Sequence, residues 1–393
     1  MTPSFFPLSA QAAHMRDGPL FLLALTALLT ALAWLGLSAF FHRRNLRAIP
    51  IRVHVAGARG KSTVTRMIAA GLRADGLRVI AKATGSEPRL VLPDGAEEVW
   101  RRRGPASVRE QIRFMARAAR MGAQAVVVEC MAVRPEFVWA SEAQLVRATL
   151  TVITNARPDH FEELGHDPQA MERALAFAIP AGGDLILSGE AATPLMLASA
   201  KARGCRTVIA PIDGLDPDEA NRAIALAACE ALGVAHDKAA QAIAEAGADP
   251  GGFFRQPMEL DGARFCFVNA FACNDVASLA RLWGSRDARA PATVLLNARR
   301  DRPLRTQGFL QFLAAQGPLP RLFLSGDPLA MRLARRAGFS PGGIHWLGAG
   351  SVEETVAALL REAGAETEVW GIGNYHGLGR DLIEYARRSA RIC

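Results

Sequence analysis

Apolar and polar positions alternate along most of the chain in a way that predicts short β-strands separated by α-helices. After one long apolar segment near the N-terminus, short apolar runs recur, and stretches with helical spacing of apolar residues lie between them. This alternation is typical of a mostly parallel, doubly wound α/β sheet. The first series of predicted strands covers residues 52–56, 78–83, 125–129, 150–154, 184–187 and 207–210, with helices such as 108–121, 169–178 and 218–232.

The same pattern restarts after a glycine-rich loop at residues 246–252, which we interpret as a domain boundary. We therefore expect a first domain over residues 51–250 and a second α/β domain over residues 251–393. The predicted elements of the second domain are strands 264–268, 293–296, 322–324, 344–347 and 368–372, with helices such as 276–283 and 352–363.

The long apolar segment, residues 19–41, contains no charged side chain and is rich in Leu and Ala. It is long enough to cross the roughly 30 Å hydrocarbon core of a membrane as a single helix. A short tail, residues 1–18, precedes it, and a basic juxtamembrane linker, residues 42–50, follows it. The positive-inside rule then predicts a single-pass protein of the plasma (inner) membrane with its remaining domains in the cytoplasm. The alternatives are a cleaved signal peptide, disfavoured by the length and the position of the basic flank, and a buried hairpin helix.

Composition narrows the class of partner. The chain has 393 residues, half of them hydrophobic, which is enough for about two globular cores. A net charge of +8 would suit an anionic substrate, a nucleotide or a membrane surface. The few aromatic residues do not interleave with basic clusters, which argues against nucleic acid. The six cysteines show no C-x-x-C spacing, which disfavours a zinc knuckle or a disulfide framework.

A glycine-bounded turn lies between the first predicted strand and the helix at residues 64–72. In this turn two glycines allow backbone N–H groups to approach phosphate oxygens, a lysine can reach the β- and γ-phosphates, and a serine hydroxyl can bind Mg²⁺. The longer Walker A pattern would have glycine where Val55 stands, and a glycine turn before a helix remains the alternative. The predicted nucleotide-binding residues are Gly57, Ala58, Arg59, Gly60, Lys61, Ser62 and Thr63.

Two further predicted strands deliver polar residues to the same edge of the sheet. Residues 125–129 end in Glu129, and in open α/β sheets ligands bind at the carboxyl ends of strands. A glutamate there could hold Mg²⁺ directly or through water, or could be an ordinary charge at the start of a loop. The next strand leads to Asp159 and His160, which form a second candidate site or, alternatively, a helix cap and a surface histidine.

Polar clusters also follow three strands of the second domain, at residues 268–275, 297–302 and 371–377. Clusters after successive parallel strands fall on one edge, and Arg299, Arg300 and Arg302 would favour phosphate or carboxylate there. Ordinary turn chemistry is the alternative for each cluster taken alone. The chain shows no Ser-His-Asp order and no cysteine near a histidine partner, so phosphoryl transfer is better supported than covalent catalysis.

In their order, these motifs resemble those of Mur-type amide ligases, a family that includes folylpolyglutamate synthases. Residues 57–63, 128–132, 155–160, 267–275, 297–302 and 371–377 look most like the ligase subunit of membrane poly-γ-glutamate synthases. The resemblance covers residues 50 to 380 and implies a Mur-ligase-like central domain with a smaller Rossmann-like C-terminal domain. It also implies activation of a carboxylate by ATP as an acyl phosphate, followed by attack of glutamate to extend poly-γ-glutamate. Small membrane subunits of a synthase complex are the implied partners, and a homo-oligomer is possible.

The resemblance further assigns roles to individual residues. Lys61 would hold the β/γ-phosphates, while Ser62, Glu129 and His160 would surround Mg²⁺. Asn221 resembles the asparagine that contacts the nucleotide in the central domain of Mur ligases.

Two arginines of the second domain also receive roles. Arg255 matches the arginine that reaches toward the γ-phosphate, and Arg302 lies on the edge where related ligases bind the incoming amino acid. Many Mur ligases have a carbamylated lysine that bridges two metals, but residues 161–200 contain no lysine.

Two other functions are compatible with the sequence. One is a membrane-anchored NTPase that drives or gates export without making a bond. The other is a ligase with a different acceptor, such as a folate-like or peptide substrate.

Overall fold

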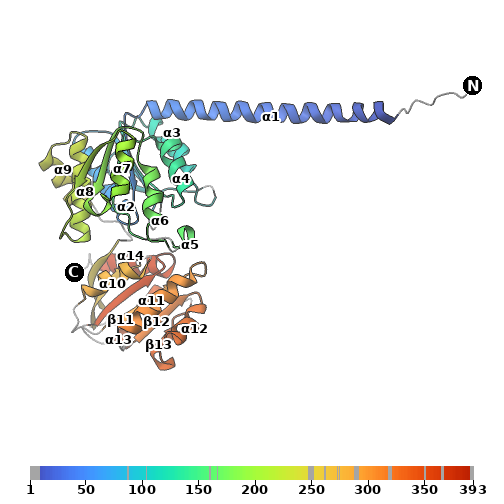
Figure 1. Ribbon diagram of the computed structural model, residues 1–393. Helices are drawn as coiled ribbons and strands as arrows, with labels where there is room; N and C mark the ends of the chain where they lie inside the picture. The colour runs from blue at the N-terminus through green and yellow to red at the C-terminus, as the bar shows by residue number, and fades with distance from the viewer. Residues whose placement is uncertain are drawn as a thin grey trace, which may run out of the picture.

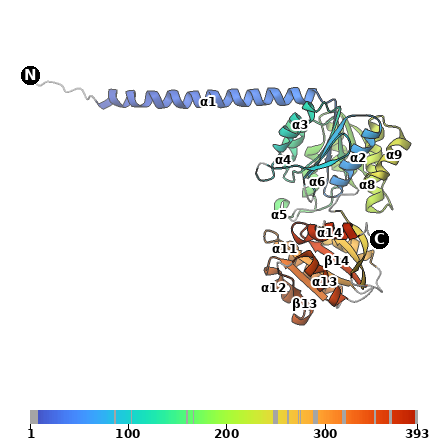
Figure 2. The ribbon, with the colours of Figure 1, turned by 180° about the vertical axis from the view of Figure 1, so that it is seen from behind.

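The computed structural model describes residues 9–389, apart from residues 86–87, 103, 159–160, 166, 247–251, 261–262, 272, 274, 287–291, 317–320, 349–350 and 364–366. One long helix leads into two α/β units, which lie one below the other in Figure 1. The helix extends away from the first unit as a single rod, and the view from behind shows the same arrangement (Figure 2). This architecture confirms the predicted α/β class with an N-terminal apolar helix.

The helix α1 (Ser9–Arg47) is longer than the predicted apolar segment. Its part from Leu20 to Arg47 is long and apolar enough to cross a membrane, judged by length and composition. The helix also includes the basic residues 42–47, which we had expected to be a linker. It ends shortly before Pro50, because proline disfavours helical backbone in the residue that precedes it.

The C-terminal end of α1 is packed onto the first unit. His42 is buried and its Nε2 donates to the carbonyl of Leu145 at 3.0 Å. Leu46 and Ile49 are buried in a core cluster that also contains Phe114 of α3 (Glu110–Arg120). These contacts attach the base of the helix to the folded unit.

The first unit is built on an eight-stranded sheet with the order β4-β3-β2-β5-β1-β6-β7-β8. Six strands are parallel, and β3 and β4 pair antiparallel at one edge. The pattern analysis missed these two edge strands because each is only three residues long. The strands are β1 (Ile51–Ala56), β2 (Val79–Ala83), β3 (Arg89–Val91), β4 (Glu97–Val99), β5 (Ala125–Glu129), β6 (Leu150–Ile153), β7 (Asp184–Ser188) and β8 (Arg206–Ala210).

Helices cover both faces of this sheet. On one face α2, α8 and α9 pack against alternate residues such as Val53 and Val127. The opposite face is covered by α3 and, beside it, by α4, α6 and α7. The helices after α1 are α2 (Lys61–Ala74), α3, α4 (Pro135–Ala140), α5 (Phe161–Leu164), α6 (Ala170–Leu175), α7 (Pro194–Ala202), α8 (Pro217–Ala231) and α9 (His236–Glu245), with a π-helical segment η1 (Ser141–Val146) after α4.

The second unit contains a six-stranded sheet with the order β13-β12-β11-β14-β10-β9. The edge strand β9 is antiparallel and was not predicted; it contains Pro257, which an edge strand tolerates because one side of its backbone has no partner. Two apolar clusters lie on the two faces of the sheet. The elements are β9 (Phe254–Leu260), β10 (Ala263–Ala270), α10 (Val276–Gly284), β11 (Ala292–Ala298), α11 (Pro303–Ala315), β12 (Arg321–Gly326), α12 (Leu329–Arg336), β13 (Ile344–Trp346), α13 (Val352–Ala363), β14 (Thr367–Gly373) and α14 (Leu378–Ser389).

Candidate nucleotide and ligation site

The predicted phosphate loop connects the central strand β1 to α2. Gly57 and Gly60 have φ values of 135° and 80°, in the region that favours glycine. A Cβ at Gly57 would clash with Thr154 Oγ1, and a Cβ at Gly60 would clash with Asn221 Oδ1. The two glycines therefore allow the backbone to turn while Thr154, after β6, and Asn221 of α8 approach it closely.

Two residues after β6 hold this loop in place. Asn155 accepts from the Arg59 amide at 3.2 Å and donates to the Arg59 carbonyl at 2.9 Å, and Thr154 Oγ1 donates to the same carbonyl at 2.5 Å. The Ala58 amide donates to the Asn155 carbonyl at 3.1 Å. The sequence motif at residues 155–160 includes Asn155, and its position just after a strand beside β1 is the signal for this role.

The lysine of the loop lies over the loop itself. Lys61 Nζ donates to the carbonyls of Gly57 at 2.7 Å and Ala58 at 3.1 Å. Ser62 and Thr63 follow in the first turn of α2, where the unpaired N–H groups and the helix dipole favour an anion. The loop thus combines a cationic side chain, glycine backbone and a helix N-terminus.

Ser62 and Glu129 are brought together beside the loop. Ser62 Oγ donates to Glu129 Oε2 at 2.8 Å, and the backbone amide of Thr84 donates to the same oxygen. Glu129 is 3% exposed and ends β5, directly beside Val55 of β1. No lysine, arginine or histidine of the described residues forms an ion pair with this buried carboxylate. Hard oxygen donors such as this carboxylate and the neighbouring hydroxyl fit a divalent cation such as Mg²⁺.

The third predicted metal ligand, His160, and its neighbour Asp159 lie outside the described residues. Within the described ranges, no group of three or more His, Cys, Asp or Glu side chains is positioned to hold a metal ion. A cation here would therefore rely on Ser62 and Glu129 together with ligands that are not clustered protein carboxylates or imidazoles, as is usual for Mg²⁺ with nucleotide phosphates.

Asn221 lies on α8, which packs on the same face of the sheet as α2. Its amide oxygen faces the position that a side chain at Gly60 would occupy. Asp216 begins this helix with a capping box that also includes Glu219. The structure therefore places Asn221 against the phosphate loop, although it lies 158 positions beyond Thr63 in the sequence.

The second unit meets the phosphate loop directly. Arg59 of the loop forms an ion pair with Asp275, which caps the N-terminus of α10. Asp275 also accepts from the amide and the hydroxyl of Ser278, both at 2.7 Å. Burial alone would raise the pKa of Asp275, but Arg59 and Ser278 lower it below its usual range. The two carboxyl edges thus face each other across a charged contact.

Asn297 links the strand ends of the second unit. It accepts from Ser325 Oγ at 3.1 Å and donates to the carbonyls of Asn374 at 2.8 Å and His376 at 3.0 Å. Because β11 lies between β12 and β14, these bonds tie three carboxyl ends together. Asn269, at the end of β10, is also fully buried.

The arginines after β11 have different surroundings. Arg299 pairs with Asp301, with N–O distances of 2.8 and 2.6 Å. Arg302 lies 4.0 Å from Glu163 of α5, so it reaches the first unit. Arg300 is exposed. Arg302 is therefore the arginine of this cluster that lies where the two units meet.

The structure does not bring Arg255 to the phosphate loop. Its guanidinium pairs with Glu368 at 2.5 Å, donates to the Ser285 carbonyl at 3.0 Å and lies over the Trp370 ring at 5.7 Å. These contacts lie inside the second unit, at the amino end of β14 and the C-terminal end of α10. The role toward the γ-phosphate that the resemblance implied therefore has no counterpart in this arrangement, since Glu368 holds the guanidinium away from the loop.

Sequence reasoning also missed a buried histidine beneath the loop. His54 of β1 is fully buried, with Nδ1 2.8 Å from Glu142 Oε2 and Nε2 3.3 Å from Ser141 Oγ. Burial would lower the pKa of His54, but Cys130 and Glu142 raise it to about 10. An isolated histidine in an apolar strand gave no signal, because its partners come from η1 and the end of β5.

The fold is that of the Mur-type ligases, with a glycine-containing loop between β1 and α2. Solved structures with the same fold include E. coli FolC in complex with ADP, at 19% identity and a TM-score of 0.66, covering 89% of this chain and 93% of that chain. Another is the Yersinia pestis bifunctional folylpolyglutamate synthase/dihydrofolate synthase with Mn, AMPPNP and L-glutamate bound, at 17% identity and a TM-score of 0.65, covering 89% and 92%.

Sequence comparison gives the particular family. The model of the poly-gamma-glutamate synthase CapB C-terminal domain matches residues 256–389. PGA synthase CapB of Bacillus subtilis (strain 168) is 30% identical over 365 residues, covering 87% of this chain and 92% of that protein. The capsule biosynthesis protein CapB of Bacillus anthracis is 28% identical over 362 residues, covering 87% and 78%. The chain belongs to the CapB family.

Proposed function

We propose that this chain is an ATP-dependent carbon–nitrogen ligase that joins glutamate units into poly-γ-glutamate at the cytoplasmic face of the plasma membrane. The observation that carries the proposal is the contact between Ser62 and Glu129 at 2.8 Å beside the phosphate loop, on an edge that faces the second unit. Membership of the CapB family supports the same substrate class, because a relative of this chain is a PGA synthase.

The nucleotide would be held by the loop between β1 and α2. The N–H groups in the first turn of α2 have no intrahelical partner and would approach phosphates, and Lys61 would supply the positive charge that a transferring phosphoryl group requires. Asn221 would contact the nucleotide from α8. Ser62, Glu129 and His160 would hold Mg²⁺, and when bound that ion would neutralise charge on the β- and γ-phosphates.

The proposed reaction has two steps. A carboxylate oxygen of the growing chain attacks the γ-phosphorus, the bond to the β-phosphate oxygen breaks, and an acyl phosphate and ADP form. The amine of an incoming glutamate then attacks the acyl carbon and loses a proton, and the tetrahedral intermediate expels inorganic phosphate as the amide bond forms. Both steps depend on positioning and on charge stabilisation, so no covalent protein nucleophile is needed.

The second unit would supply the grip on glutamate. Arg302 lies at the junction of the units, and a guanidinium can bind a carboxylate with two parallel hydrogen bonds. Arg299 pairs with Asp301 inside its own loop, whereas Arg302 reaches Glu163 of the first unit, so Arg302 is the better candidate for a contact at the junction. Arg255 would stabilise the second sheet through Glu368 rather than contact phosphate.

We further propose that α1 crosses the membrane once, with its basic end in the cytoplasm, where ATP is present. Small membrane subunits of a synthase complex would be the partners that receive the polymer.

Full-length protein reconstituted in lipid nanodiscs tests this function. With ATP, Mg²⁺ and isotope-labelled glutamate, we expect ADP formation that depends on glutamate, together with a γ-linked labelled product. ADP formation without glutamate and without a product would instead favour an NTPase that drives export. Incorporation only with a folate-like or peptide acceptor would indicate a different ligase.

A further inference from the structure

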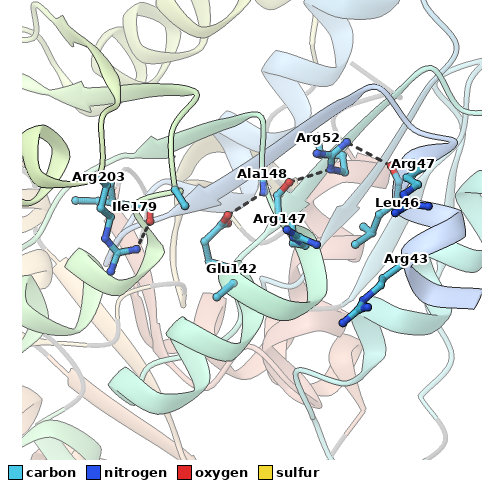
Figure 3. Close-up of a pocket in the computed structure, with 11 residues that line it drawn as sticks. Arg43, Leu46, Arg47, Arg52, Glu142, Arg147, Ala148, Ile179 and Arg203 are labelled. Atoms are coloured by element: carbon cyan, nitrogen blue, oxygen red, sulfur yellow. Dashed lines mark hydrogen bonds between the residues drawn. The ribbon is translucent and has the colours of Figure 1, made fainter. Parts of the chain in front are cut away.

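A cavity of about 420 Å³ lies at the base of α1 (Figure 3). Five arginines line this cavity, and we call it the basic cavity. Two come from α1, one is the second residue of β1, one follows η1 and one follows α7. They are Arg43, Arg47, Arg52, Arg147 and Arg203.

The charges around this cavity are not balanced. Within its lining of described residues, the one acidic side chain is Glu142. Both carboxylate oxygens of Glu142 are engaged, Oε2 with His54 Nδ1 and Oε1 with the Ala148 amide, each at 2.8 Å. Glu142 is therefore held by His54 and by a backbone amide rather than by an arginine of the cavity.

The arginines themselves are bound to backbone or point to solvent. Arg52 donates to the carbonyls of Arg147 at 2.9 Å and Ile49 at 2.7 Å, and Arg203 donates to the carbonyl of Ile179. Arg43, Arg47 and Arg147 are exposed, and in the part of the chain that the structure describes none of the five forms an ion pair with a carboxylate. Figure 3 shows Arg43 and Arg47 on one side of the cavity, Arg203 on the other, and Arg147 between them.

The backbone holds this arrangement in place. Arg147 has a φ of 49°, which is uncommon for a residue other than glycine, and it turns the chain from η1 toward β6. In this conformation its carbonyl accepts from Arg52. Like charges gathered around a small cavity repel one another, and an anion bound between them would relieve that repulsion.

The position of the cavity separates it from the nucleotide site. Its residues lie before β1, β6 and β7, at the amino edge of the sheet, whereas the phosphate loop follows β1 at the carboxyl edge. The six residues of β1 span roughly 20 Å between the two edges. The polymer would be made at the carboxyl edge, so the cavity does not line its path of synthesis.

We propose that the basic cavity binds the phosphate headgroup of an anionic phospholipid in the membrane that α1 crosses. The inference rests on the proposed anchoring of α1. Arg43 and Arg47 directly follow the apolar part of the helix, which places them at the level of the headgroups. The volume lies in the range of small-ligand pockets, about 300–1,000 Å³, and suits one headgroup rather than an extended polyanion. Leu46 and Ile179 in the lining provide apolar surface beside the charges.

Binding would fix the orientation of the first unit relative to the membrane. The cavity is formed by α1 together with η1 and the strand ends of the first unit, so a headgroup bound in it would contact both. This adds to the attachment already made by His42 and Leu145.

The test uses full-length protein in nanodiscs of phosphatidylcholine, alone or mixed with phosphatidylglycerol, and counts retained phosphatidylglycerol by native mass spectrometry without ATP. The double variant Arg147→Gln, Arg203→Gln removes two cavity charges and leaves α1 unchanged. The matched control Arg120→Gln, Arg222→Gln removes two exposed charges that do not line the cavity and are not on α1. Circular dichroism melting verifies that each variant folds.

We expect the cavity variant to lose roughly tenfold or more in affinity for phosphatidylglycerol, since each arginine near a membrane surface contributes about fivefold. The control should stay near wild type. An equal loss in both variants would show a general surface-charge effect and overturn the proposal. Displacement of the lipid by millimolar inorganic phosphate, or by short poly-γ-glutamate, would identify a free-phosphate or a polymer site instead.

The readout also separates this inference from the proposed function. If the wild-type protein makes polymer but the cavity variant still retains phosphatidylglycerol, the lipid site is overturned and the proposed ligase activity is not. If the wild-type protein retains phosphatidylglycerol through the cavity arginines but makes no amide product, the proposed ligase activity is overturned and the lipid site is supported.

Discussion

Arg59 in the phosphate loop and Asp275 at the N-terminus of α10 form an ion pair that connects the two α/β units at the candidate site. The side chains are mostly buried, with 21% and 16% of their surface exposed. We therefore expect nucleotide binding at the loop to be coupled to the position of the second unit through this contact.

Asp275→Asn tests this coupling, because asparagine keeps the helix cap while removing the charge. A hydrogen bond to a charged group contributes about 1.5–3 kcal/mol, so we expect ligation at subsaturating ATP to fall by roughly tenfold or more. The single variant Ser278→Ala, which leaves Arg59 paired, serves as the control. Unchanged rates in Asp275→Asn would show that the ion pair does not influence the reaction.

The same pair predicts a pH dependence. The pKa of Asp275 is lower in the folded protein than in the unfolded chain, where it is about 3.9. Its contribution to stability is therefore fully present above that value and is lost as the pH falls through the folded pKa. The difference in melting temperature between wild type and Asp275→Asn should be constant from pH 8 to about 5 and shrink below about 4. A difference that changes between pH 6 and 8 would indicate another group.

Lys61→Ala should abolish glutamate-dependent product formation and leave the fold intact. In the proposed reaction the lysine would supply charge to the transferring phosphoryl group, and removal of one such stabiliser costs about 10²–10³ in rate. Lys238→Ala removes an exposed lysine that pairs with Asp75 and is the control. Activity of Lys61→Ala within a few-fold of wild type would contradict the role of the loop.

Glu129→Gln should raise the Mg²⁺ concentration needed for half-maximal rate by about tenfold or more. The amide oxygen can still accept from Ser62 and Thr84, so the local hydrogen bonds persist while the charge that a hard cation requires is gone. Glu230→Gln changes an exposed glutamate that pairs with His236, and its Mg²⁺ titration should match wild type. If both variants titrate alike, Glu129 has a structural role.

Arg302→Lys should raise the KM for glutamate by about tenfold and change the KM for ATP little, because lysine cannot reproduce a two-pronged contact with a carboxylate. Arg299→Lys is the matched control, because Arg299 lies in the same loop but is paired with Asp301. Steady-state kinetics and a melting curve are measured together. A lowered melting temperature with an unchanged glutamate KM would mean that Arg302 mainly joins the units through Glu163.

Removal of α1 should be tolerated only if its base is kept. A chain that begins at Phe41 retains buried His42 and Leu46, whereas one that begins at Ala48 loses both. Loss of a buried leucine and one hydrogen bond should lower the free energy of unfolding by about 2–4 kcal/mol. Urea denaturation of the two truncated chains measures this difference. Equal stabilities would show that the helix base does not contribute to the fold.

Local pattern was enough to predict much of this protein. The strands β1, β5 and β6, the phosphate loop and the carboxylate at Glu129 were predicted from contiguous residues, because strand periodicity and glycine–lysine spacing are encoded over a few positions. The edge strands β3, β4 and β9 were missed. Two of them are too short to show a period, and β9 contains a proline that only an edge position tolerates.

Tertiary structure decided how side chains distant in sequence are combined. It placed Asn221 against Gly60, directed Arg255 to Glu368, and surrounded His54 with Glu142 and Ser141. The basic cavity likewise combines arginines from α1, η1 and the segment after α7. A short sequence window records which residues share one element, but the partner of a charged side chain depends on which elements pack together. That packing is decided by burial of the whole apolar surface.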